Sequence, residues 1–370
     1  MTGTHRRIVI APDSFKGSLS AAEAARAMAA GWSSFRDGDE IVLRPMADGG
    51  EGTLDAFLAA HDAEPRTTRV AGADGRDRDA PWALLSDGTA IIELGVCCGI
   101  EQLGSARAPF TAHTAGFGQA IGAALDAGAE RLVLGIGSSA STDGGAGMLS
   151  ALGARLLDAG GREVAPSPDG LASLASVDLS ALRAAPAGGV LVLSDVTNPL
   201  TGPAGAAAVF GPQKGIPAER IGEVDDVLSR WAQLLTAAAE ADGDLVAAPG
   251  SGAAGGTGFA LRVWGADLVP GAAAVADLIG LAAASAAADV VITGEGSYDA
   301  QSAAGKVPAH VASLSSAATV LIAGRITPDA DTSAFAVALS LTELAGSSEA
   351  SLTDPRRWLH EAAASAAARV

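Results

Sequence analysis

A glycine-rich segment, GIGSSASTDGGAG at residues 135–147, constrains this chain more than any other feature. It follows an apolar run at 131–134 and precedes a helical pattern in which Met148, Leu149 and Leu152 recur. Strand, glycine loop and helix in this order are typical of α/β folds. Such a loop permits positive φ angles, and the unpaired N–H groups that open the next helix attract anions. The segment predicts a phosphate or small-carboxylate site, although a tightly packed turn of small residues gives the same pattern.

The same arrangement recurs along the chain. Apolar runs at 7–11 and 40–44 lead into PDSFKG and MADGGEGT, and a capping box of Ser20 and Glu23 begins a helix that is expected to reach about Ala30. Runs at 190–193 and 290–293 lead into SDVTNP and GEGSYDAQSAAGK. Successive strand and helix units predict a parallel sheet, and ligands bind at the carboxyl ends of such strands.

Other patterns bear on the domain organisation. Residues 67–86 carry a looser pattern with clustered charges, which favours a change of domain there. A second glycine-dense loop, PGSGAAGGTG, covers 249–258, and an amphipathic helix is expected at 217–241. Two more strands are expected at 320–323 and 336–339, and a capped surface helix at 354–369.

Composition excludes several classes of partner. The formal net charge is -18, from 42 acidic and 24 basic residues, so nucleic acid and anionic membranes are not expected to bind. The first residues lack a signal-peptide pattern, and no uncharged apolar stretch is long enough to span a bilayer, so a cytoplasmic protein is expected. The two cysteines, Cys97 and Cys98, are expected to be buried and reduced.

The lysines and carboxylates suggest a function. The chain has three lysines, Lys16, Lys214 and Lys306, and all lie in the glycine loops. A lysine ammonium is a compact charge suited to phosphate. Carboxylates beside such lysines can hold Mg²⁺ and accept a hydroxyl proton during phosphoryl transfer. The carboxylates concerned are Asp13, Asp48, Glu51, Asp143, Asp195, Glu295 and Asp299, of which Asp143 could equally be a helix cap.

Taken together, these motifs resemble those of the bacterial glycerate kinase family. The resemblance rests on IAPDSFKGSLSA, MADGGEGT, GIGSSASTDGG, DVTNPLTGPAGAAAVFGPQKG, SGAAGGTG and GEGSYDAQSAAGK, in that order along nearly the whole chain. The family's central loop usually reads closer to GGSATNDGG, so Ser138 replaces its second glycine. The resemblance implies ATP-dependent phosphorylation of D-glycerate, most often to 2-phosphoglycerate, in organic acid and glyoxylate metabolism.

The resemblance also implies a two-domain α/β fold. A flavodoxin-like parallel domain would be built from both chain ends, 1–70 and 266–370, with a second α/β domain, 71–265, inserted and the active site in the cleft. The expected ligands are ATP, Mg²⁺ and D-glycerate, and a homodimer is compatible with the sequence. A kinase, phosphatase or isomerase for a related hydroxy acid, or a non-catalytic sensor of anionic metabolites, remains as an alternative.

The charged and polar residues of these loops suggest the following site roles as hypotheses. Asp195 is expected to orient or deprotonate the acceptor hydroxyl, while Lys16 and Lys214 bind glycerate carboxylate or the transferring phosphate. Magnesium ligands are expected among Asp48, Glu51, Glu295 and Asp299. Residues expected to bind substrate or phosphate are Asp13, Ser14, Ser138, Ser139, Asn198, Gly255, Gly256 and Lys306.

Overall fold

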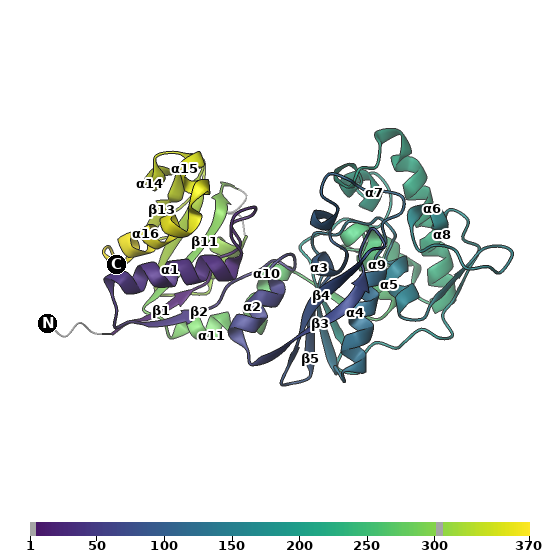
Figure 1. Ribbon diagram of the computed structural model, residues 1–370, viewed down its shortest axis with the longest axis horizontal. Coiled ribbons are helices and arrows are strands. Elements are labelled where there is room, and N and C mark those ends of the chain that lie inside the picture. The colour runs from purple at the N-terminus through teal and green to yellow at the C-terminus, as the bar shows by residue number, and fades with distance from the viewer. Residues whose placement is uncertain (1–4, 301–305) are drawn as a thin grey trace. The chain divides into compact units, whose positions relative to one another are not determined.

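The structure, a computed structural model, describes residues 5–300 and 306–370. These residues form two compact units (Figure 1). The first unit comprises the described residues of Met1–Asp48, Asp55–His61 and Ala272–Val370, and the second comprises Gly49–Leu54 and Asp62–Gly271. Residues 301–305 of the expected GEGSYDAQSAAGK loop lie outside the described residues. Within the described chain, no helix is both long enough and apolar enough to cross a membrane.

The first unit is built on a five-stranded sheet in which every pairing is parallel. The strand order is β13-β12-β11-β1-β2. Numbered within this unit, the order reads 2-1-3-4-5, which is flavodoxin-like. The α/β class and the flavodoxin-like domain formed by both chain ends are thereby confirmed. The strands are β1 (Arg7–Ile10), β2 (Glu40–Leu43), β11 (Val290–Tyr298), β12 (Ala318–Ile326) and β13 (Val337–Ser340).

Helices from the two chain ends cover one face of this sheet. Helix α1 (Ala21–Phe35) begins with the expected Ser20 capping box and lies beside α16 (Pro355–Ala367) (Figure 1). The helix continues past Ala30, because Gly31 does not end it but allows α16 to pack closely against it. A Cβ at Gly31 would overlap the His360 carbonyl. Helix α16 buries Leu359 and four alanines, so the expected surface helix is half buried. The other helices here are α2 (Thr53–Ala60), which begins in the second unit, α10 (Gly271–Leu278), α11 (Leu281–Ala286), α13 (Val307–Ser313), α14 (Leu341–Ala345) and α15 (Ser348–Thr353).

Strand β11 is longer than the apolar run that predicted it. The sequence indicates a strand over 290–293 followed by a loop, whereas the strand continues to Tyr298. The reason is β12, which is equally long and pairs with β11 from Val290↔Ala318 to Tyr298↔Ile326. Glu295 therefore lies within a strand and is buried, not in a loop as expected.

The second unit contains a mixed six-stranded sheet, ordered β10-β9-β6-β5-β4-β3. The stretch 67–86, where the sequence favours a change of domain, forms most of an antiparallel hairpin at the sheet edge, and the long segment of the second unit begins shortly before it, at Asp62. The charged residues of the hairpin alternate with buried Val70, Ala80 and Trp82, which is the pattern of an edge with one covered face. The strands are β3 (Ala63–Ala71), β4 (Asp77–Leu85), β5 (Thr89–Glu93), β6 (Arg131–Gly135), β9 (Val190–Leu193) and β10 (Asp267–Val269), with β7 (Arg155–Leu157) and β8 (Ser176–Asp178) forming a separate pair.

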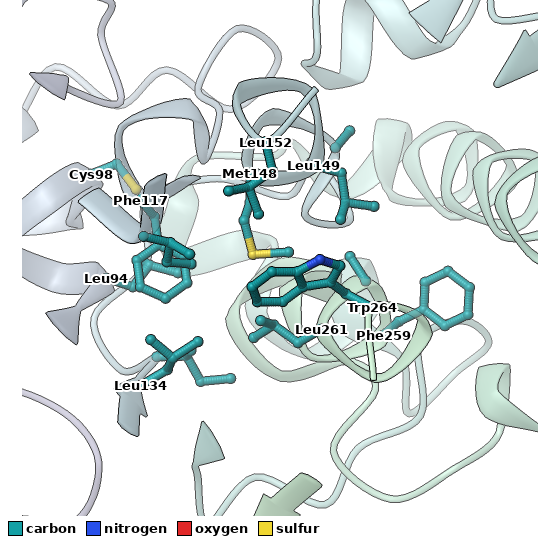
Figure 2. Close-up of a cluster of buried hydrophobic side chains, with 14 of the residues drawn as sticks. Leu94, Cys98, Phe117, Leu134, Met148, Leu149, Leu152, Phe259, Leu261 and Trp264 are labelled. Atoms are coloured by element: carbon teal, nitrogen blue, oxygen red, sulfur yellow. The ribbon is translucent and has the colours of Figure 1, made fainter. Parts of the chain in front are cut away.

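An apolar core fixes the helices of this unit around the central glycine loop. Met148, Leu149 and Leu152 follow the loop and pack with Phe259 and Leu261 in this core (Figure 2). Cys97 and Cys98 are free thiols buried in the same core. The helices are α3 (Leu94–Cys98), α4 (Ala115–Asp126), α5 (Ala146–Ala151), α6 (Pro168–Leu171), α7 (Ala206–Phe210), α8 (Ile221–Ala239) and α9 (Ala253–Val263), with 3₁₀ turns η1 (Ile100–Leu103), η2 (Pro212–Lys214), η3 (Ala218–Arg220) and η4 (Gly243–Val246).

Candidate active site

In the first unit, three carboxylates lie near one another: Asp13 and Asp48 in loops that follow β1 and β2, and Glu295 within β11. Asp13 follows β1, its N–H donates to the Gly294 carbonyl at 2.8 Å, and its Oδ1 accepts from the Ser14 N–H at 2.6 Å. Burial, then the nearby charges of Asp48 and Glu295, raise the pKa of Asp13 to about 7. Lys306 opposes this shift without cancelling it. A carboxyl group held near neutrality by burial and like charges is a frequent feature of functional sites.

The lysines of this unit are exposed, as Asp48 is, whereas Asp13 is partly buried and Glu295 is buried. Lys16 and Lys306 are both exposed, and the Lys306 ammonium lies 4.0 Å from Oδ1 of Asp299. A Cβ at Gly296 would lie 3.4 Å from the Lys16 N–H nitrogen, so the loop after β1 runs directly beside β11. The first unit thus brings together Asp13, Ser14, Asp48, Glu295 and Lys306 from the predicted site residues.

The second unit contains the central loop, and a buried aspartate organises it. Asp143 is fully buried and accepts hydrogen bonds from the N–H and hydroxyl of Thr114 at 2.8 and 2.7 Å and from the Ser141 hydroxyl at 2.9 Å. The N–H groups of Gly145 and Gly147 also donate to it, at 3.3 and 3.1 Å. Asp143 therefore acts much as the expected helix cap does, although Gly145 is the N-cap residue of α5.

Lys214 lies beneath this loop, not on its surface. Its side chain is 3% exposed, and its ammonium donates to the Ser139 hydroxyl at 2.8 Å and to the Ser141 carbonyl at 2.5 Å. Burial lowers the pKa of Lys214 to about 8, although Asp143 and Cys98 act in the opposite direction. Burial also raises the pKa of the Cys98 thiol to about 12, so this neighbour is uncharged near neutral pH.

Ser138 adopts an unusual backbone conformation at the exposed tip of the loop. Its φ angle is 58°, in the left-handed region that glycine prefers. A non-glycine residue held there costs about 1–3 kcal/mol and persists only where the surrounding structure fixes it. Nearby, the Thr142 hydroxyl is buried and has no hydrogen-bond partner among the residues described.

The second glycine-dense loop packs directly onto the central loop. Gly255 and Gly256 have φ angles of 67° and 93° within the first turn assigned to α9, so the expected loop is present there. A Cβ at Gly255 would overlap the Ser141 carbonyl and lie 2.9 Å from the Lys214 ammonium nitrogen. The Gly144 N–H donates to the Gly255 carbonyl at 3.0 Å. Only glycine fits this approach, and the pair of loops forms one connected structure.

The remaining predicted residues of this unit lie in other loops. Asp195 follows β9, is exposed, and accepts a hydrogen bond from the Gly271 N–H at 2.8 Å. The Asn198 side chain donates to the Ala204 carbonyl at 2.8 Å, while the Gly252 N–H donates to the Asn198 carbonyl at 2.9 Å. Glu51 belongs to this unit and is exposed.

Thr114 contacts the central loop and is absent from the residues predicted from the sequence. Its hydroxyl donates to Asp143 and accepts from the Met148 N–H at 2.9 Å, which connects the start of α4 to the start of α5. The available signal was a threonine placed immediately before a helical run, a position that favours capping. Its partner lies 29 residues away, and no local pattern identifies that partner.

The two clusters suit different parts of a phosphoryl-transfer reaction. Crowded carboxylates beside exposed lysines fit a phosphate accompanied by a divalent cation. Glycine loops at strand ends fit anionic oxygens, because the backbone can approach a ligand closely there. Neither cluster, as far as its residues are described, contains a histidine or cysteine positioned as a nucleophile.

Comparisons with known proteins agree with this chemistry. The family described as "Glycerate kinase family" matches residues 8–370. The glycerate kinase of Bacillus subtilis is 45% identical over 311 residues, covering 83% of this chain and 81% of that protein. The glycerate 2-kinase of Escherichia coli K12 is 43% identical over 312 residues, covering 83% and 81%. A crystal structure described as a candidate glycerate kinase 2 from Salmonella typhimurium LT2 superposes with a TM-score of 0.85 at 39% identity, covering 99% of this chain and 98% of that one.

Proposed function

The chain belongs to the glycerate kinase family, and from this premise we propose that it transfers the terminal phosphoryl group of ATP to the 2-hydroxyl of D-glycerate. The relatives named as glycerate kinase and glycerate 2-kinase support the reaction and the choice of hydroxyl. Membership of a kinase family implies ATP as the co-substrate, and we propose that the enzyme acts in the cytoplasm. The observation that carries the proposal is the family match across residues 8–370, which includes every loop of both clusters.

In the first unit, we assign the carboxylates to the phosphate and cation side of the reaction. Asp13, Asp48 and Glu295 lie close enough to raise the pKa of Asp13, and a divalent cation would relieve this repulsion. The described residues contain no group of three or more His, Cys, Asp or Glu side chains that could enclose a metal ion. Mg²⁺ is commonly held by one or two carboxylates together with substrate phosphates and water, so the donor set fits Mg²⁺ that arrives with the nucleotide.

The same unit supplies positive charge for the phosphates. Lys16 and Lys306 are exposed, so their ammonium groups can contact phosphate oxygens or the glycerate carboxylate. The carboxylates would hold Mg²⁺ while the lysines neutralise charge on the transferring group. Bound Mg²⁺ supplies charge neutralisation to the phosphoryl oxygens. Asp299 and Glu51 remain proposals for its outer ligands.

In the second unit, we assign Asp195 to the acceptor hydroxyl. The Gly271 N–H fixes one oxygen of this exposed carboxylate, which orients the side chain at the end of β9. An oriented carboxylate can accept the hydroxyl proton as the phosphoryl group is transferred. Asn198 lies three residues further on, and Ser138, Ser139, Gly255 and Gly256 belong to the loops that we assign to anionic oxygens of the substrates.

The decisive experiment measures ADP release from MgATP with D-glycerate, with L-glycerate and without acceptor. We expect release with D-glycerate alone. Passing the product directly to enolase identifies 2-phosphoglycerate, because the 3-isomer requires a mutase before enolase can act. Acceptor-independent ADP release, or none from folded protein, would contradict the proposal, and an enolase signal that depends on added mutase would contradict the assigned hydroxyl.

A further inference from the structure

We propose that Lys214 is a positioning residue whose buried ammonium holds the exposed Ser138 in its left-handed conformation at the tip of the central loop. The inference deepens the proposed function and rests on it, because it concerns how that loop presents itself to substrate. It differs from the sequence-based hypothesis, in which Lys214 itself contacts glycerate or phosphate. Both partners of the ammonium described above, the Ser139 hydroxyl and the Ser141 carbonyl, belong to the protein.

Hydrogen bonds fix the backbone on both sides of Ser138. Before it, the Gly137 N–H donates to the Gly49 carbonyl at 3.1 Å. At Ser138 itself, the carbonyl accepts from the Ile100 N–H at 2.8 Å. After it, Ser139 is buried and its hydroxyl accepts from Lys214, while the Ala140 N–H donates to the Cys98 carbonyl at 3.3 Å. A residue in a strained conformation, as Ser138 is, persists only where several surrounding contacts hold it in this way.

Among these contacts, Lys214 contributes the only hydrogen bond that comes from a side chain, and its ammonium carries charge. A charge-assisted hydrogen bond is about twice as strong as a neutral one. The ammonium reaches two loop residues at once, and Gly255 packs against it so closely that its nitrogen would lie 2.9 Å from an added Cβ. Lys214 thus fixes the central loop from its buried side, and the loop that contains Gly255 packs against the ammonium.

The hydrogen bond from Lys214 to Ser139 depends on protonation of the Lys214 amine. The titratable groups that face Lys214 are Asp143, from the central loop, and the Cys98 thiol, from α3. Because burial outweighs them, the ammonium loses its proton near pH 8, far below an exposed lysine. A neutral amine makes weaker bonds to Ser139 and Ser141. The restraint that Lys214 places on the conformation of Ser138 should therefore weaken over a pH range in which an exposed lysine stays charged.

The test compares Ser139→Ala with Thr68→Val as its matched control. Both changes remove one hydroxyl that accepts a side-chain N–H bond in the second unit; in the control the donor is Trp82 Nε1, at 2.9 Å on the edge hairpin. We expect Ser139→Ala to lower kcat/KM for D-glycerate by at least about tenfold, since misplacing a positioned group by about 1 Å can cost about a hundredfold. Thr68→Val should stay within about twofold of the wild-type protein.

Amide hydrogen exchange measures the loosening of the central loop independently of catalytic activity. In Ser139→Ala the amides of Ile100 and Ala140 should exchange at least about tenfold faster than in Thr68→Val at the same pH, because local opening exposes them. If both amides exchange equally in the two variants, the positioning role is wrong. If the wild-type protein releases no ADP with D-glycerate, the proposed function fails, yet the exchange comparison still decides the role of Lys214.

Isotopic labelling of lysine allows the pH dependence of the proposal to be tested by NMR. The three lysines of the chain give three side-chain NMR signals, and the signal of Lys214 should titrate near pH 8. Wild-type kcat should fall over the same range, and Lys214→Arg, which keeps its charge, should remove that fall. A kcat that stays constant while the Lys214 signal titrates would overturn the proposal, and this comparison needs no variant to fold.

Discussion

Replacing Asp13 with asparagine tests whether the crowded carboxylates of the first unit serve function at the expense of stability. Asp13 is held beside Asp48 and Glu295, and burial with their charge raises its pKa to about 7 from an ordinary value of 3.8. The folded chain therefore binds this proton more tightly than the unfolded chain does. The stabilising contribution of that proton is present at acidic pH and is lost as the pH rises through about 7.

The size of the effect follows from the shift. One pKa unit corresponds to about 1.4 kcal/mol, and the range from about pH 5 to about pH 7 spans two units, which gives an upper value of about 3 kcal/mol. Asp13 is only partly shielded from solvent, so we expect about 2 kcal/mol in practice. The introduced asparagine keeps an oxygen that can accept from the Ser14 N–H but carries no charge, so the variant avoids this loss.

The assay is urea unfolding at about pH 5 and about pH 8, followed by tryptophan fluorescence. The stability gain of Asp13→Asn over the wild-type protein should grow by about 2 kcal/mol between the two pH values. Its kcat/KM should fall at least about tenfold, the usual exchange of activity for stability at a functional site. Asp39→Asn is the control, since Asp39 accepts from the Arg6 N–H and the Trp32 indole in the same unit. A gain that is equal at both pH values would refute the reasoning.

Three further predictions concern the second unit. Asp195→Asn should lower kcat by about a hundredfold or more with unfolding unchanged, and near-normal turnover of folded variant would rule out its assignment to the acceptor hydroxyl. Ser138→Gly should raise the free energy of unfolding by up to about 1 kcal/mol, because glycine adopts φ 58° without strain; a loss of stability in urea would contradict this. Asp143→Ala should lower it by more than about 3 kcal/mol, because buried donors of Thr114 and the loop lose their acceptor, and calorimetry showing a smaller change would disprove that role.

Much of the fold could be predicted from the sequence because most of its strands coincide with short apolar runs. The apolar runs ending in Gly, Asp or Ser correspond to β1, β2, β6, β9 and β11, and the capping box of Ser20 begins α1 as expected. Two of the differences have one physical cause. The end of β11 and the continuation of α1 past Gly31 are each decided by a partner distant in sequence. Local patterns carry no information about that partner.

The candidate site could be predicted as a set of loops, but not as a set of contacts. Asp13 with Asp48 and Glu295, and the central loop with Gly255, come from segments far apart in the chain. The rule that strand ends share one edge of a sheet was enough to group them. It could not show that Asp143 would be saturated by hydrogen bonds, because Thr114 lies 29 residues away.

The three lysines show why residue type in a loop does not settle its chemistry. All three sit in glycine-rich segments, and the sequence treats them alike. Lys16 and Lys306 are exposed, whereas Lys214 is 3% exposed and bonded to Ser139 and Ser141, residues more than 70 positions away. A lysine can bind phosphate only where its ammonium reaches the ligand. Where other loops enclose the lysine, its charge instead stabilises the loop that contacts the ligand. Burial also moves the pKa of Lys214 toward neutrality. The pH dependence of turnover, rather than the affinity for phosphate, is therefore the property through which Lys214 should be recognised.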